Sequence, residues 1–139
     1  MNRTEMIELW ERHARYEFEA KDADAAVSTM VADASVMHLP TMSGGTGRDT
    51  LLEYYRDVFI PGIPDGTVNE PVARFVGDDF LVDQAIMILR HDREIPFLLT
   101  ELAPTGILLA VPFAVLAQLG VFGDGPVPAF LRDATLRLT

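Results

Sequence analysis

The sequence contains no cysteine, and this absence excludes several kinds of chemistry at once. Without thiols the chain can form no disulfide, no cysteine-based metal site and no thiolate nucleophile. Only one of its 11 basic residues is a lysine, Lys21, and the 21 acidic residues give a formal net charge of -10. Such a charge repels phosphate groups, so the composition argues against nucleic acid and anionic membrane surfaces as partners.

Long apolar runs are also missing. The most apolar segment, residues 107–117, has 11 residues and contains Pro112, so it is too short and too interrupted for a membrane-spanning helix. Residues 1–11 are polar and lack the apolar stretch of a signal peptide. Apolar residues nevertheless make up 49% of the chain, which is typical of a folded protein. We therefore expect one soluble, cytoplasmic domain over residues 1–139.

Helical periodicity characterises the first half of the chain. Apolar residues at helical spacing predict a first helix over residues 4–20, capped either by a capping box of Asn2 and Glu5 or by Thr4. A second helix is expected over residues 23–31 and a third over residues 48–59.

Strand signals alternate with turn residues. Residues 35–39 predict a short strand, whereas the glycines of residues 41–47 predict an irregular loop. The clearest hairpin follows, because residues 68–76 and 80–91 are rich in strand-forming residues and flank a short glycine-containing turn.

The pattern after residue 106 is less regular. Residues 107–111 predict a strand, residues 113–119 fit either a strand or a helix, and residues 128–138 fit a terminal helix. Helices followed by antiparallel strands are typical of an α+β fold in which the helices cover one face of the sheet. We expect a cone-like curved antiparallel sheet wrapped around the N-terminal helices, with an apolar pocket at its mouth.

Five short motifs carry more specific information. In chain order they are Leu9-Trp10-x-x-His13, the segment His38-x-Pro40-Thr41-Met42-x-Gly44-Gly45-x-Gly47-Arg48, Val82-Asp83, His91-x-x-Glu94 and Pro104-Thr105-Gly106. Together they resemble the SnoaL-like group of the nuclear-transport-factor-2-like superfamily. The resemblance implies a cystatin-like roll that dimerises through its sheet. It also implies roles that range from polyketide cyclisation to isomerisation, dehydration or simple binding.

One departure from this family pattern lies near the C-terminus. In relatives, the Pro-Thr-Gly turn opens a strand, and a further strand precedes a Val-Leu-x-Gln-x-Gly helix. Here residues 111–114 lead directly into residues 115–120. By usual hairpin lengths the resemblance implies that about twenty residues of sheet are missing. The sheet would then be shortened, with an edge that must be capped, swapped or paired with a partner.

Asp83 is the first candidate for acid–base catalysis. It is a carboxylate in an otherwise apolar strand, on the same strand face as Met87. If that face lines the pocket, removal from water would suit Asp83 to proton transfer. The alternative is a structural ion pair with Arg74 across the hairpin.

His38 is the second candidate. It ends the short strand immediately before the proline and glycines, a position that commonly faces a pocket mouth. A histidine there can act as acid, base or hydrogen-bond donor near neutral pH. The alternative is that it holds the loop through a backbone hydrogen bond.

His13 and Glu17 lie one turn apart on the first predicted helix and can hydrogen-bond to each other. Glu17 falls on the apolar face of that helix, an unusual position for a carboxylate. The pair either reaches into the pocket or anchors the boundary before Asp22.

His91, Asp92 and Glu94 are the residue types of a metal site. A loop with the pattern His-Asp-x-Glu has no established ligand geometry, however, so a surface charge cluster is the preferred interpretation. We predict no metal site and no cofactor.

The remaining pocket candidates are four large side chains, Trp10, Tyr55, Phe59 and Met87. Such residues are core by default, but any that line the cone would suit a flat apolar ligand with a carbonyl group. The leading hypothesis is a cofactor-free isomerase, cyclase or dehydratase, with Asp83 as base and His38 and a tyrosine polarising the carbonyl. The alternative is a non-catalytic binding or dimerisation module.

Overall fold

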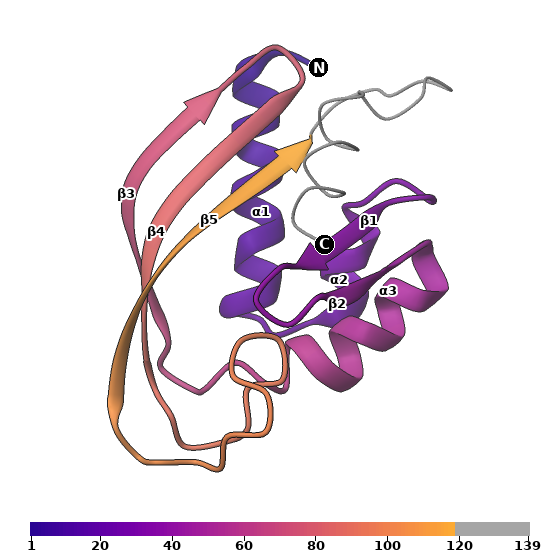
Figure 1. The fold of residues 1–139 in the computed structure, drawn as a ribbon. Helices are drawn as coiled ribbons and strands as arrows, with labels where there is room; N and C mark the ends of the chain where they lie inside the picture. The colour runs from indigo at the N-terminus through magenta and orange to yellow at the C-terminus, as the bar shows by residue number, and fades with distance from the viewer. Residues whose placement is uncertain (119–139) are drawn as a thin grey trace.

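A computed structural model of the protein describes residues 1–118 and shows helices on the concave side of a curved antiparallel sheet (Figure 1). The element order is α1, α2, β1, β2, α3, η1, β3, β4 and β5. The predicted α+β architecture is confirmed.

The first helix, α1 (Arg3–Phe18), begins at the predicted capping box. The Asn2 side chain accepts a hydrogen bond of 2.9 Å from the Glu5 N–H, and the Glu5 carboxylate accepts one of 2.8 Å from the Asn2 N–H. Two N–H groups that the helix leaves unpaired are thereby satisfied.

Two further helical segments complete the helical layer. α2 (Ala23–Ser28) is capped by the side chain of Asp22. α3 (Arg48–Tyr54) continues into a π-helical turn, η1 (Tyr55–Phe59). π-Helical turns occur frequently at functional sites, and this one carries the predicted site residues at both of its ends.

The glycine-rich segment forms a strand, so the prediction of an irregular loop over residues 41–47 was wrong. β1 (Ser35–His38) pairs with β2 (Ser43–Thr46) in antiparallel register. Gly44 has φ +150°, and a Cβ atom there would overlap the Val36 carbonyl oxygen. Glycine at this position permits the close approach of two strands instead of interrupting them.

The main sheet has the order β3-β4-β5, with both pairings antiparallel. β3 (Val68–Val76) and β4 (Phe80–Arg90) confirm the predicted hairpin to within one residue at each strand end. β5 (Leu108–Gln118) is one continuous strand. Pro112 is compatible with it because, among the described strands, β5 pairs with β4 alone, and an edge strand tolerates a missing N–H.

β5 also shows that residues 113–118, for which the sequence fits either a strand or a helix, form a strand. Residues 115–118, which correspond to the beginning of a helix in the family pattern, continue the strand. The predicted terminal helix over residues 128–138 lies outside the described residues.

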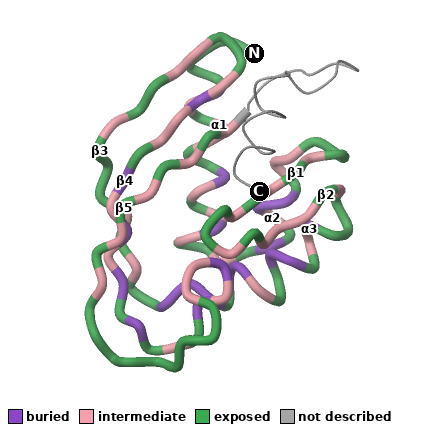
Figure 2. The backbone as a smooth tube through the Cα atoms, viewed as in Figure 1, coloured by how far each residue is buried: buried purple, intermediate pink, exposed green. Residues whose placement is uncertain are grey.

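The core lies where the helices face the sheet, and Figure 2 shows the buried residues gathered there. β4 contributes Leu81, Ala85, Met87 and Leu89 from alternate positions, as expected for a strand with one buried face. Burial of a large apolar side chain stabilises a fold by about 1.5–3 kcal/mol, so this face anchors the sheet to the helices. No described helix is long and apolar enough to cross a membrane.

A candidate acid–base site in the interior

A row of aromatic rings crosses the interior and joins most of the residues that the sequence analysis proposed. Trp10 packs on His13 with 5.7 Å between ring centroids, and His13 lies 6.1 Å from Tyr55. Tyr55 is 5.2 Å from Phe59, which in turn lies 4.6 Å from His38. These rings, which we call the ring row, come from α1, η1 and β1. Only tertiary packing brings them together.

One end of the ring row holds a buried carboxylate. Glu17 Oε1 lies 2.7 Å from His13 Nε2 and accepts a hydrogen bond of 2.8 Å from the Tyr55 hydroxyl. The exposed fractions are 7% for His13, 6% for Glu17 and 2% for Tyr55. The predicted contact between His13 and Glu17 is confirmed. Both contacts fall on one oxygen, and no hydrogen bond from residues 1–118 reaches Oε2.

The hydrogen-bond partners of His13 determine its charge. Nδ1 lies 3.1 Å from the Ala26 carbonyl oxygen and 2.7 Å from the Thr29 hydroxyl oxygen. The Thr29 hydroxyl donates its own proton to the Ala26 carbonyl, so its oxygen is left to accept from His13. The Glu17 carboxylate is an acceptor as well. Both ring nitrogens of His13 therefore face acceptors, and both are expected to carry protons.

The pKa of His13 agrees with this assignment. Burial lowers the pKa, but the hydrogen bond to Glu17, its negative charge and the Ala26 carbonyl together outweigh burial, so the pKa lies above its ordinary value. Burial, followed by the charge of Glu17, raises the pKa of Tyr55 far above its ordinary value. The result is an imidazolium–carboxylate pair with a neutral tyrosine donor beside it.

The other end of the ring row holds an uncharged histidine. Nδ1 of His38 lies 2.6 Å from the Tyr54 hydroxyl oxygen, so the side chain contacts a hydroxyl and not the backbone expected in the alternative interpretation. Burial lowers the pKa of His38, and the charge of Glu17, which acts in the opposite direction, is the smaller effect. Within the described chain, Nε2 of His38 has no hydrogen-bond partner.

A line of three hydroxyls, which we call the hydroxyl chain, extends from His38. Tyr54 Oη lies 3.0 Å from Ser43 Oγ, and Ser43 Oγ lies 2.7 Å from Thr41 Oγ1. Thr41 donates a hydrogen bond of 3.1 Å to the Phe97 carbonyl. His38 and Ser43 are cross-strand partners in the β1–β2 pair, so their side chains lie on one face, where Tyr54 reaches both.

Asp83 is held in an ion pair. Arg74 lies opposite it in β3 and donates from Nε at 3.2 Å and from Nη2 at 2.9 Å, while the Trp10 indole N–H donates at 2.8 Å. Arg74 also donates to Glu11 at 2.8 Å, which ties α1 to the hairpin. The ion pair that the sequence analysis gave as the alternative is present. A role for Asp83 as catalytic base stays a prediction.

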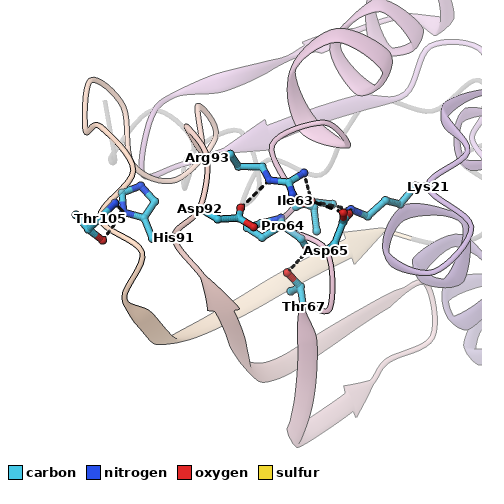
Figure 3. Close-up of polar contacts among 9 residues, drawn as sticks. All are labelled: Lys21, Ile63, Pro64, Asp65, Thr67, His91, Asp92, Arg93 and Thr105. Atoms are coloured by element: carbon cyan, nitrogen blue, oxygen red, sulfur yellow. Dashed lines mark hydrogen bonds and ion pairs between the residues drawn. The ribbon is translucent and has the colours of Figure 1, made fainter.

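His91 is buried, so its interpretation as part of a surface charge cluster was wrong. Its exposed fraction is 1%, because the turn at Thr105 and Gly106 folds over it. Nδ1 accepts a hydrogen bond of 3.3 Å from the Thr105 N–H and lies 3.0 Å from the Thr105 hydroxyl (Figure 3). Among residues 1–118, no group of three His, Asp or Glu side chains is placed to hold a metal ion.

A surface hollow of about 560 Å³ lies apart from the ring row. Three of its charged side chains contact one another. Lys21 Nζ donates to Asp65 at 2.8 Å and to the Ile63 carbonyl at 2.7 Å, and Arg93 lies 3.7 Å from Asp65 (Figure 3). None of the residues predicted for the site lines this hollow.

The arrangement of elements matches solved structures. A hypothetical protein with a ketosteroid isomerase-like fold from Catenulispora acidiphila DSM 44928, in complex with trimethylamine, aligns with a TM-score of 0.59 and 17% identity over 81% of this chain and 76% of that chain. A protein from Jannaschia sp. CCS1 described as a SnoaL-like polyketide cyclase aligns with a TM-score of 0.57 and 17% identity over 83% and 78%. The chain shares the ketosteroid isomerase-like fold of these structures. Its sequence matches no protein-family model and no curated protein.

Within this fold, the site contains residues that the sequence analysis did not assign. Tyr54 has no role there, and Thr41 and Ser43 lie in the expected loop. The signal that would have found them is the pairing of His38 with Ser43, which requires the glycine-rich segment to be recognised as a strand.

Proposed function

We propose that this protein binds a small apolar carbonyl compound in its interior and moves protons on it by cofactor-free acid–base chemistry, as an isomerase, cyclase or dehydratase. The observation that carries the proposal is the buried Glu17 carboxylate, whose Oε1 is engaged by His13 and Tyr55 while no partner from residues 1–118 reaches Oε2. Oε2 is the oxygen that can take a proton from a ligand.

In this proposal the ligand lies beside the ring row, within reach of both Glu17 and His38. From there Glu17 Oε2 removes a proton from a carbon next to the carbonyl, and the electron pair moves to the carbonyl oxygen. In a substrate with a C=C bond next to that carbon, return of the proton to the far carbon of the double bond, as the electron pair moves back from the oxygen, completes an isomerisation. His38, on the other side of Phe59, supplies a second proton-handling group through Nε2.

Asp83 has a supporting role in this proposal. Arg74 and Trp10 together donate to both of its oxygens. Asp83 therefore fixes Trp10, the outer ring of the row, and Glu17 replaces it as the proposed base. The names of the two solved structures refer to an isomerase-like fold and to a cyclase, and both reaction classes need a base next to a carbonyl.

The test is hydrogen exchange at carbon. Cyclohexanone and 2-tetralone are incubated with the protein in D₂O, and loss of the proton signals next to the carbonyl is followed by ¹H NMR. We expect wild type to accelerate exchange and Glu17→Gln to lose about 10²–10⁴-fold of that acceleration. Glu19→Gln, an exposed change on the same helix, should keep it. Exchange at the buffer rate with wild type, or undiminished exchange with Glu17→Gln, would contradict the proposal.

A second candidate is a homodimerisation module, favoured by the convex face of the sheet. One row of this face runs across three strands through Phe75, Val82 and Leu116, and a second runs through Val68 and Ile88. The exposed fractions are 62% for Phe75, 47% for Leu116 and 53% for Val68. Figure 2 shows exposed residues recurring along the outer strands. In a chain with a net charge of -10, a second copy of this mainly apolar face is a suitable cover.

Sedimentation measures this candidate directly. We expect a concentration-dependent dimer for wild type and a monomer for Phe75→Glu. Val31→Glu is the matched control, because Val31 is 64% exposed but lies after α2, away from the sheet. A monomer at all concentrations would exclude the dimerisation module and leave the acid–base proposal unaffected.

A further inference from the structure

We infer that Thr41 and Ser43 are positioning residues that hold His38 with its ring proton on Nδ1 and thereby leave Nε2 as an acceptor toward a ligand. The inference goes beyond the proposed function, because it concerns the protonation of a ring and can be tested without any turnover. It rests on the hydroxyl chain, in which each hydroxyl has one proton to donate.

The direction of the hydroxyl chain is set at its far end. A backbone carbonyl can only accept, so the 3.1 Å contact from Thr41 to the Phe97 carbonyl uses the single proton of Thr41. The Thr41 oxygen is then an acceptor for the Ser43 hydroxyl at 2.7 Å. Ser43 therefore donates its only hydroxyl proton to Thr41, away from His38.

The same reasoning determines which ring nitrogen of His38 carries the proton. Since the Ser43 proton points to Thr41, the Ser43 oxygen accepts from the Tyr54 hydroxyl at 3.0 Å. The Tyr54 oxygen must then accept at its 2.6 Å contact with His38, so Nδ1 is the donor and carries the proton. Burial lowers the pKa of His38, which keeps the ring at one proton near neutral pH. The lone pair of that neutral ring lies on Nε2.

The two other histidines provide internal references. His13 faces acceptors at both nitrogens, so it is expected to carry two protons. His91 accepts the Thr105 N–H at Nδ1, so its proton lies on Nε2. The three histidines of the chain are therefore expected in three different forms.

The experiment is a long-range ¹H–¹⁵N correlation spectrum of uniformly ¹⁵N-labelled protein near pH 7, with His38 assigned by its loss in His38→Gln. In wild type we expect Nδ1 of His38 at the shift of a protonated nitrogen and Nε2 at that of a bare one. In Thr41→Val, which removes the hydroxyl at nearly constant shape, the Nδ1 signal should move toward that of a bare nitrogen. Thr41→Ser, which restores a hydroxyl, should return the wild-type signals.

Thr46→Val is the matched control, since Thr46 lies on the same strand pair but outside the hydroxyl chain. Unchanged His13 signals in each variant show that the fold is kept. If Thr41→Val does not fold, Tyr54→Phe, which removes the acceptor next to His38, makes the same prediction. A bare Nδ1 in wild type, or a His38 spectrum that is the same in wild type and Thr41→Val, would overturn the inference. Absence of ketone exchange would contradict the proposed function and leave this inference unaffected.

Discussion

The two ends of the ring row contain the same residue type in opposite states. His13 is enclosed by a carboxylate, a carbonyl and a hydroxyl oxygen, and its pKa is raised. His38 contacts a single hydroxyl among rings of Phe59, Tyr54 and Phe97, and its pKa is lowered. Both rings are largely buried, so burial alone does not decide the charge of either. The number and type of acceptors around each ring decides it.

This difference assigns separate tasks to the two ends. The His13 end is a closed, charged cluster that orients Glu17. In the proposed function, the His38 end is a neutral group whose Nδ1 is fixed by the hydroxyl chain and whose Nε2 faces the ligand. A site that moves a proton from one position to another needs both kinds of group. In the ring row, Tyr55 and Phe59 lie between the two groups.

The largest expected effect comes from removing the charge at the His13 end. Glu17→Gln removes the charged partner of the buried His13 ring, which should lower the free energy of unfolding by about 3–5 kcal/mol. The pKa of His13 should fall below its ordinary value, because burial is then the dominant influence. Urea denaturation and NMR titration of His13 measure the two effects. Glu19→Gln, which is exposed, should change neither, and an unshifted His13 in Glu17→Gln would refute the ion pair.

A smaller effect is expected from the strand pair that carries the His38 end. Gly44→Ala places a Cβ atom against the Val36 carbonyl in a conformation unfavourable to side chains, which should cost about 1–3 kcal/mol. Gly66→Ala is the control, because Gly66 also has a positive φ but no atom lies near the added Cβ. The His38 signals should shift in Gly44→Ala while the His13 signals stay in place. Equal responses of both histidines would show that the two ends are not independent.

Asp83, which holds Trp10 at the outer end of the ring row, should contribute less to the free energy of unfolding. Asp83→Asn weakens the pair with Arg74 and the hydrogen bond from Trp10, both partly exposed, which should cost about 1–2 kcal/mol. The fluorescence of Trp10, the only tryptophan, should shift as well. Asp79→Asn in the adjacent turn is the control. If Asp83→Asn also abolished ketone exchange while keeping the fold, Asp83 and not Glu17 would be the base.

The smallest effect is the dependence of stability on pH. The raised pKa of His13 stabilises the fold fully below the ordinary value of 6.5, and this contribution is lost as the pH rises through the folded-state value. The lowered pKa of His38 acts in the opposite sense, with a contribution that is present above 6.5 and lost as the pH falls through its folded-state value. NMR titration should therefore find His13 above and His38 below 6.5. Any other order of the two pKa values would contradict the opposite states assigned to His13 and His38.

Local patterns in the sequence were sufficient for much of the fold. The capping box at Asn2 and Glu5, the contact between His13 and Glu17, and the hairpin around residues 77–79 each depend on residues close in the chain, where spacing alone sets the geometry. The SnoaL-like motifs pointed to the same fold that the structural comparison found. The glycine-rich segment was misassigned because a glycine that interrupts a strand and one that permits close pairing look the same in sequence.

The absence of cysteine, the excess of acidic residues and the lack of a long apolar run were determined by the sequence alone, and they limit the chemistry to oxygen and nitrogen side chains. The sequence also identified which histidines and carboxylates deserved attention. Only the tertiary structure decided their states, because a side chain's charge depends on the acceptors that surround it in space. Glu17, Ala26 and Thr29 surround His13 with acceptors, while the carbonyl of Phe97 sets the direction of the hydroxyl chain that ends at His38.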